Sequence, residues 1–325
     1  MGVIENQVII RSIMAGNTLL PHDRGHLLWT AEDGVSRLLL SSMDRWVTAI
    51  LADDDIDSPM YGSSSQISAS IMAKGDGIIA GTAMVDHLIQ IWAPSIQISW
   101  RASDGKKVST GEEIANLTGC RDSILLAERS ILNILGHLSG IATETKKWAS
   151  KAVRQVACTR KTTWGLLDKW AVHLGGGLTH RLTRNDALMI KENDLASMDE
   201  SSDDNNKKIA QLIQSLQIDD VTSFIEIEVR TDKEAITAAA VWQQTHEQEN
   251  KKFVIMLDNF GPERCKDVVN QLESMNLREA VLLEASGNIT FDELDQWFEC
   301  GVDVISTSAI NRGVKPLDIS MIVGD

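Results

Sequence analysis

From about residue 155 to residue 306 the chain repeats one pattern, in which a short apolar run is followed by a longer amphipathic stretch. Short continuous apolar runs are typical of strands buried on both faces. Repetition of strand, helix and strand predicts a parallel sheet, and a closed or nearly closed β/α barrel is the simplest such fold. The runs are QVACTR at 155–160, ALMI at 187–190, FIEIEV at 224–229, FVIML at 253–257, AVLLE at 280–284 and VDVIS at 302–306.

The segments between the later runs have helical spacing of apolar residues. They lie at 207–217, 232–248, 262–274 and 290–300. The polar stretch SMDESSDDNNKK at 197–208 has no repeating apolar pattern, so we expect a solvated loop before a helix.

The first part of the chain has a different pattern, which indicates strands and tight turns. Residues 66–81 and 96–119 are strand-like and contain Asp-Gly and Thr-Gly pairs, as in antiparallel hairpins. Helical spacing begins near Ser123, with Asp122 and Ser123 as candidate caps and Gly140 near the expected end. This pattern predicts a long connecting helix.

Composition limits the classes of function. The formal net charge of −15 over 325 residues argues against a general nucleic-acid-binding surface. The segment from Lys151 to Lys191, however, contains eight Lys or Arg and only two acids, which gives it a local formal charge of +6. Such an island attracts small anions, although a solvated basic face is the alternative. We expect no membrane partner and a cytoplasmic location, since the first residues lack a signal sequence and no apolar run is long enough to span a membrane.

Charged or phosphate-compatible residues follow five of the expected strands, where barrel enzymes place their chemistry. The triple glycine at 175–177 is a candidate anion-approach loop and leads to His180 and Arg181. A lone histidine is more often structural than catalytic, but its basic neighbours favour a role at a site. The residues at strand ends are Arg160, Lys161, Lys191, Glu228, Asp258, Asn259, Glu284, Ser286 and Gly287.

Several ordered motifs resemble one family, quinolinate phosphoribosyltransferase, also called nicotinate-nucleotide pyrophosphorylase. The resemblance runs from about Gly75 to the C-terminus. Its motifs are AERSILNILGHLSGIATET at 127–145, TRKTTWG at 159–165, KWAVHLGGGLTHR at 169–181, ALMIKEND at 187–194, EIEV at 226–229, IMLDN at 255–259, LEASGNIT at 283–290 and GVDVIS at 301–306.

The resemblance implies an α/β fold with two domains. Residues 1–126 would form an α/β sandwich, with 312–325 returning to it, and 127–311 an incomplete β/α barrel with most of the active site. It also implies a homodimer or higher oligomer, and a reaction in which quinolinate and phosphoribosyl pyrophosphate give nicotinate mononucleotide, pyrophosphate and CO2 with Mg2+.

Site residues follow from the matching motifs. Planar guanidinium and ammonium groups suit the two carboxylates of quinolinate. Lys161, Glu228 and Asp258 are the implied catalytic residues, and the two acids also hold ribose and, indirectly, magnesium. Arg129 would reach the site of a neighbouring subunit. The substrate-binding set is Arg129, Arg160, Lys161, His180, Arg181 and Lys191, and the phosphate turns contribute Ser286, Gly287, Asn288, Ser308 and Ala309.

Departures from the family pattern concern the acceptor. Trp164 replaces a usual proline, the stretch between Gly165 and Lys169 is short and lacks an arginine, and Asp194 replaces a frequent histidine. Asn288 and Ser308 replace glycines in the phosphate turns.

Three alternative functions stay open. The first is phosphoribosyl transfer to another acceptor, by a nicotinate-type enzyme or a molybdenum-operon relative. The second is an aldolase with a Schiff-base lysine, Lys161 or Lys191. The third is a carrier module suggested by the hairpin at 104–119.

Overall fold

The barrel half of the protein is built on one parallel sheet of six strands, in the order β8-β13-β12-β11-β10-β9. The computed structural model describes residues 20–324 except 63, 153–154, 198–203, 219–221 and 247–250. The expected parallel sheet is confirmed, and its two end strands do not pair with each other within these described residues, so the barrel is incomplete. The strands are β8 (Val156–Ala157), β9 (Leu188–Ile190), β10 (Ile225–Val229), β11 (Phe253–Asp258), β12 (Leu282–Ser286) and β13 (Val304–Ser306).

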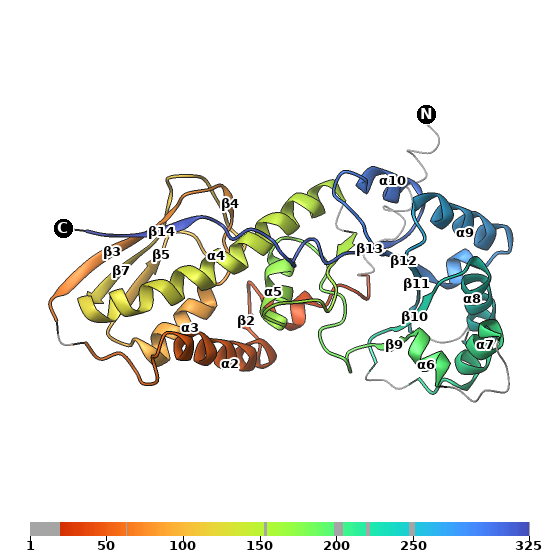
Figure 1. Cartoon of the computed structure of the whole chain (residues 1–325), viewed down its shortest axis with the longest axis horizontal. Coiled ribbons are helices and arrows are strands. Elements are labelled where there is room, and N and C mark those ends of the chain that lie inside the picture. The colour runs from red at the N-terminus through yellow and green to blue at the C-terminus, as the bar shows by residue number, and fades with distance from the viewer. Residues whose placement is uncertain are drawn as a thin grey trace.

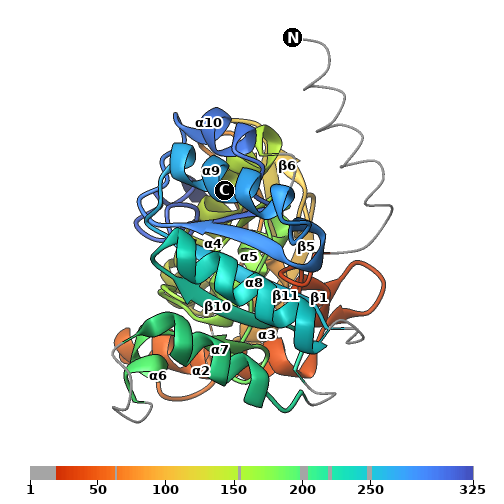
Figure 2. The same ribbon diagram turned by 90° about the vertical axis from the view of Figure 1, so that its right-hand side faces the viewer.

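Helices follow the strands; α7, α8 and α9 cover the outer face of this sheet, whereas α5 packs against α4 (Arg121–Lys151) between the two halves (Figures 1 and 2). The α9 helix begins with a proline at its first turn, where the missing N–H costs nothing. These helices are α5 (Leu166–Leu174), α6 (Glu192–Ala196), α7 (Asn205–Ser215), α8 (Asp232–His246), α9 (Pro262–Ser274) and α10 (Leu294–Glu299), with the 3-10 turn η2 (Arg278–Ala280) before β12.

The predicted loop at 197–208 is wrong at its C-terminal end, because α7 already begins at Asn205. The Asp204 carboxylate accepts a hydrogen bond from the Asn206 backbone N–H and so caps this helix, although the sequence there is polar. Residues 198–203 of that predicted loop lie outside the described part of the chain.

The other half of the protein contains a four-stranded antiparallel sheet, in the order β14-β3-β7-β5. Its strands are β3 (Gln66–Ala73), β5 (Gln97–Trp100), β7 (Glu113–Cys120) and β14 (Ile319–Val323), so the C-terminal segment lies beside β3. Two helices, α2 (Arg37–Asp53) and α3 (Thr82–Trp92), pack with this half (Figure 1). Short pairs complete it: β1 (Trp29–Thr30) with β2 (Gly34–Val35) after the 3-10 turn η1 (Gly25–Leu27), and β4 (Gly77–Ile78) with β6 (Lys107–Val108).

The long connecting helix predicted by the sequence is present as α4 (Arg121–Lys151), which joins the two halves (Figure 1). Its predicted ends are wrong. The N-cap is Cys120, while the Ser123 hydroxyl donates to the Met60 carbonyl oxygen instead. Gly140 lies inside the helix and does not end it. This position suits glycine because the backbone at Lys315 crosses the helix too closely for a side chain. The α4 helix is long and apolar enough to cross a membrane, but 61% of its most apolar window is buried inside the protein, as in a core helix.

Candidate active site

A cavity of about 910 Å³ opens at the carboxyl ends of the parallel strands. All residues of the predicted catalytic, substrate-binding and phosphate-binding sets except Arg129 line it, although they come from the ends of six strands and from the connecting loops. Glu284, a further strand-end candidate, does not line the cavity. Four Lys or Arg and two acids line the cavity, which gives a formal surplus of two positive charges before histidine is considered. The lining is Thr159, Arg160, Lys161, His180, Arg181, Met189, Lys191, Glu228, Met256, Asp258, Asn259, Ser286, Gly287, Asn288, Ile289, Thr290, Ser306, Thr307, Ser308 and Ala309.

The first group of cations follows β8. Arg160 and Lys161 are exposed to solvent in the cavity. The backbone at Lys161 is fixed on both sides: its N–H donates to the Thr159 hydroxyl (3.1 Å), and its carbonyl accepts from the Asn311 side-chain amide (3.0 Å). The ammonium is therefore free to meet a ligand while its backbone stays in place.

Arg181 is a different kind of cation, since its side chain is buried. One of its nitrogens donates to the Ala187 carbonyl (3.4 Å) and the other contacts the Met189 sulfur (3.1 Å). Burial lowers the pKa of Arg181, and the neighbouring positive charge of Arg160 lowers it further. A buried guanidinium with weak partners is well suited to bind a carboxylate or phosphate.

An acidic pair, Glu228 and Asp258, lies beside Lys191 at the rim of the cavity. Lys191 forms an ion pair with Glu228. Burial raises the pKa of Asp258, and the nearby charge of Glu228 raises it further, so the two carboxylates act on each other. Their oxygens, together with those of a ligand phosphate, are the donors that Mg2+ prefers.

The turn after β12 carries the predicted phosphate-binding residues in an unusual backbone conformation. Gly287, Asn259 and Asn288 all have positive φ, at 101°, 58° and 50°. Asn259 links the turns, since its side-chain amide donates to Asp258 (2.9 Å) and its carbonyl oxygen accepts from Asn288 (3.4 Å). Strained backbone of this kind often gathers at functional sites.

His180 lies at the inner side of the cavity, buried and with a positive φ of 53°. Burial alone would lower the pKa of His180, but the carboxylates of Glu284 and Glu226 outweigh it and raise that pKa to about 10. The Arg181 backbone N–H nevertheless donates to His180 Nδ1 (2.7 Å), which requires an unprotonated Nδ1. The ring proton therefore lies on Nε2, which faces Glu226 (3.4 Å) and Glu284 (3.3 Å).

The triple glycine does not line the cavity, so its predicted role as an anion-approach loop is wrong. A Cβ at Gly175 would lie 2.5 Å from the Ala142 carbonyl, and one at Gly177 would lie 2.6 Å from the Thr145 side chain. Both neighbours belong to α4. These glycines therefore allow the loop to pack closely on the connecting helix.

Three other positions lie away from the cavity lining. Arg129 is exposed on α4. Trp164, where the family usually has proline, stacks on Trp46 (5.6 Å between ring centroids) and contacts His137 (4.2 Å). Asp194 caps α6 by accepting from the Lys191 backbone N–H (2.7 Å). The departures at 164 and 194 thus have local structural roles.

Only part of the basic island reaches the cavity. Arg160, Lys161, Arg181 and Lys191 do, whereas Lys169 is buried and donates to the Thr179 carbonyl oxygen (2.6 Å). Lys151 pairs with Asp295 (3.1 Å), and Arg154 lies outside the described residues.

Sequence reasoning missed the neutral lining residues and His22. Thr159, Met189, Met256, Ile289, Thr290 and Ser306 lie within the quoted motifs, but they carry no charge and are not singled out as site residues. His22 lies in a segment without apolar periodicity, far in sequence from the residues it contacts.

The fold and this cavity define a class: enzymes that bind phosphorylated, carboxylate-bearing ligands at the open rim of an incomplete β/α barrel. Sequence profiles then give the family. The profile of the quinolinate phosphoribosyl transferase C-terminal domain matches residues 141–322, and that of the N-terminal domain matches residues 55–139. The chain belongs to the quinolinate phosphoribosyl transferase family.

Individual relatives agree with this assignment. The chain is 35% identical over 266 residues to a probable nicotinate-nucleotide pyrophosphorylase (carboxylating) of Archaeoglobus fulgidus, covering 79% of this chain and 95% of the relative. It is 36% identical over 263 residues to quinolinate phosphoribosyltransferase (decarboxylating) 1 of Nicotiana glauca, covering 78% and 72%. A solved nicotinate-nucleotide pyrophosphorylase from Francisella tularensis aligns with a TM-score of 0.72 at 31% identity, covering 87% of this chain and 96% of that one.

Proposed function

We propose that this enzyme transfers the phosphoribosyl group from phosphoribosyl pyrophosphate to the ring nitrogen of quinolinate, with loss of CO2, to give nicotinate mononucleotide and pyrophosphate. The relatives named above support the activity. The observation that carries the proposal is the single cavity that joins a cationic half, with Arg160, Lys161 and Arg181, to an acidic half, with Glu228 and Asp258.

The cationic half suits the acceptor. Quinolinate has two carboxylates on adjacent ring carbons, and paired guanidinium and ammonium groups bind such anions well. Arg160, Arg181 and Lys161 would hold the carboxylates, with His180 at the inner wall and Lys191 at the rim. When the ring carbon loses CO2, the electron pair stays on the ring until a proton arrives, and these cations stabilise that charge.

The acidic half suits the donor. Glu228 and Asp258 would bind the ribose hydroxyls and favour the positive sugar carbon that forms as pyrophosphate leaves. The turns with Ser286, Gly287 and Asn288, and with Ser308 and Ala309, would take the phosphate oxygens. Mg2+, held by Glu228 and Asp258 through water or pyrophosphate, would neutralise charge on the leaving group.

The complete site would belong to an oligomer. Arg129 is exposed on α4 and does not line the cavity of its own chain, so we place it in the site of a neighbouring subunit of a homodimer or larger homo-oligomer. A location in the cytoplasm is part of the same proposal; several plant relatives are named mitochondrial or chloroplastic, which makes compartment a property of each protein.

A direct assay tests the activity. Purified protein is incubated with Mg2+ and phosphoribosyl pyrophosphate, and with either quinolinate or nicotinic acid, and the products are identified by mass spectrometry. We expect nicotinate mononucleotide and CO2 from quinolinate alone. Turnover of nicotinic acid but not quinolinate would overturn the proposed acceptor, and no phosphoribosyl product from either would overturn the activity.

A further inference from the structure

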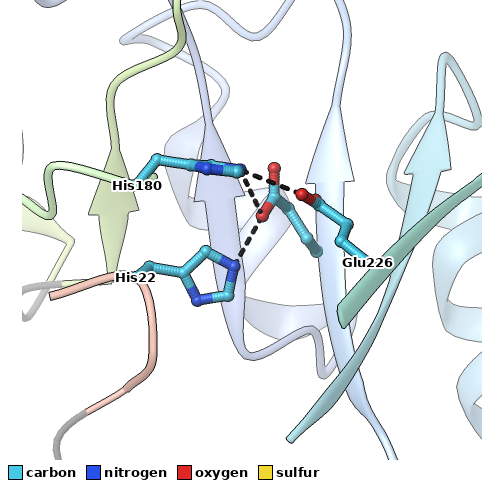
Figure 3. A group of neighbouring side chains, drawn as sticks. His22, His180 and Glu226 are labelled. Carbon is cyan, nitrogen blue, oxygen red and sulfur yellow. Dashed lines mark ion pairs between the residues drawn. The ribbon is translucent and has the colours of Figure 1, made fainter. Parts of the chain in front are cut away.

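A second cluster of ionisable side chains lies deeper than the cavity rim, and nothing above assigns it a ligand. It consists of His22, His180, Glu226 and Glu284, which come from the segment before η1, the loop before β9, β10 and β12. One donor atom of each side chain lies within 4.8 Å of the others. His22, His180 and Glu226 converge from opposite sides of the barrel interior (Figure 3).

All four side chains are buried, and their polar atoms are poorly satisfied. His22, Glu226 and Glu284 have no exposed surface. His22 Nε2 lies 2.8 Å from Glu284 Oε2, and His180 Nε2 lies 3.3 Å from the same oxygen and 3.4 Å from Glu226 Oε2. His22 Nδ1 and the other oxygen of each glutamate have no hydrogen-bond partner among the described residues. Buried polar groups are normally paired, so the unpaired buried atoms of this cluster call for a further binding partner. Side chains that bind a common ion bring their donor atoms close together, as these four do.

The charges of the two buried glutamates also favour a bound cation. Two fully buried carboxylates are very costly without compensation. Arg181 donates to Ala187 and Met189, and His180 accepts the Arg181 N–H at Nδ1, which makes its ring neutral. A divalent cation would balance the two carboxylates and leave both imidazoles neutral.

We propose that His22, Glu226 and Glu284 bind a divalent transition-metal ion, with Zn2+ the expected occupant. One imidazole and two carboxylates are ordinary zinc ligands. His180 is an outer partner and not a ligand: with Nδ1 occupied, its Nε2–H lies 3.4 Å from Glu226 and 3.3 Å from Glu284, where it orients both carboxylates.

This site differs from the proposed magnesium site in position and chemistry. Glu226 and Glu228 are two residues apart on β10 and so face the same side of the strand, with Glu228 at the cavity and Glu226 further from its carboxyl end. Imidazole favours transition metals, whereas Mg2+ prefers oxygen donors. The ion would also connect the segment at His22 to the barrel beneath His180.

Metal content of the full-length protein tests the proposal. The protein is stripped with a chelator, dialysed against Zn2+ in excess Mg2+, and analysed by mass spectrometry of the metal and by titration calorimetry. We expect one tightly bound zinc per chain, with affinity reduced at least tenfold in His22→Ala, His22→Asn and Glu226→Gln. His87→Ala is the matched control, because His87 pairs with Asp44 (2.6 Å) in the other half of the protein, and it should retain the zinc.

Diffraction from crystals of the wild-type protein makes the test independent of how the variants fold. Anomalous scattering at the zinc edge should show one ion between His22, Glu226 and Glu284. No bound zinc, equal zinc affinity in folded His22 variants, or an ion only at Glu228 and Asp258 would each overturn the proposal. None of these readouts requires phosphoribosyl transfer, so failure here and failure of the proposed activity are distinguishable.

Discussion

At the scale of single residues, the cavity contains cations of two kinds. Lys161 is exposed and makes its hydrogen bonds through the backbone, so the fold does not depend on its ammonium group. Arg181 is buried against Ala187 and Met189, and its removal would leave a gap in the protein as well as a missing charge. Lys161 is therefore the better position for separating chemistry from stability.

Lys161→Ala is expected to lower kcat/KM for quinolinate by about 100-fold or more, as when a preorganised charge at a reacting centre is lost. The free energy of unfolding should change by less than about 0.5 kcal/mol, since the substitution is on an exposed side chain. Steady-state kinetics and urea unfolding measure the two effects, with exposed Lys106→Ala as the control. Full activity in Lys161→Ala would remove this lysine from the site.

Gly287→Ala should destabilise the turn after β12 for two reasons. Its φ of 101° disfavours any side chain, and a Cβ there would overlap the side chain of Asn259. Gly111→Ala is the control because Gly111 has a φ of 89° but open space around it. We expect about 1 kcal/mol lost in the control and about 1–3 kcal/mol more at Gly287, measured by urea unfolding. Equal losses would mean that Asn259 moves aside freely.

At the scale of elements, α4 is the part of the molecule on which both halves pack. Its apolar residues are buried along most of its length, and the segment at 315–317 crosses it on the way to β14. The crossing is close because Gly140 and Gly136 have no side chains. A helix interior normally disfavours glycine by roughly 0.5–1 kcal/mol relative to alanine, so these glycines serve the crossing and not the helix.

Gly140→Ala should therefore destabilise the protein although it raises helix propensity. The new Cβ would lie 2.5 Å from the Lys315 carbonyl oxygen and 2.9 Å from Pro316 Cα, both backbone atoms. We expect a loss of about 1–3 kcal/mol in the free energy of unfolding. Gly136→Ala, whose Cβ would lie 3.3 Å from the Leu317 oxygen, should be close to neutral in the same thermal and urea measurements. A Gly140→Ala variant more stable than the wild type would show that the segment at 315–317 moves aside to accommodate the new side chain.

At the scale of the whole molecule, the proposal that concerns Arg129 requires more than one chain. The cavity holds every predicted cation except Arg129, which is exposed on the helix that joins the two halves. In a symmetric oligomer, a residue that points away from its own site can complete the equivalent site of a partner.

Complementation between subunits tests this arrangement. Arg129→Ala and Lys161→Ala should each be nearly inactive alone. A mixed oligomer of the two contains a site with Lys161 from one subunit and Arg129 from the other, so co-refolded mixtures should regain activity. Product formation in the mixture, compared with each variant alone, is the measurement. Absence of rescue in a mixture shown to contain hetero-oligomers would count against a shared site.

The sequence by itself determined the parallel sheet, the connecting helix and the motifs of the family. Those features depend on local periodicity and on short motifs, such as the strand ending in Asp258 or the turn at Gly287. The ends of α4, the packing role of the triple glycine and the helix start at Asn205 were decided by neighbours that the pattern does not reveal.

Only the tertiary structure decided which residues meet in space. It joined Arg160, Lys191 and Asp258 in one cavity and left Arg129 outside. It also brought His22 to Glu284 inside the barrel, a contact across more than 250 residues. The physical reason is that apolar spacing records which face of an element is buried, whereas the partner buried against that face depends on how the whole chain closes on itself.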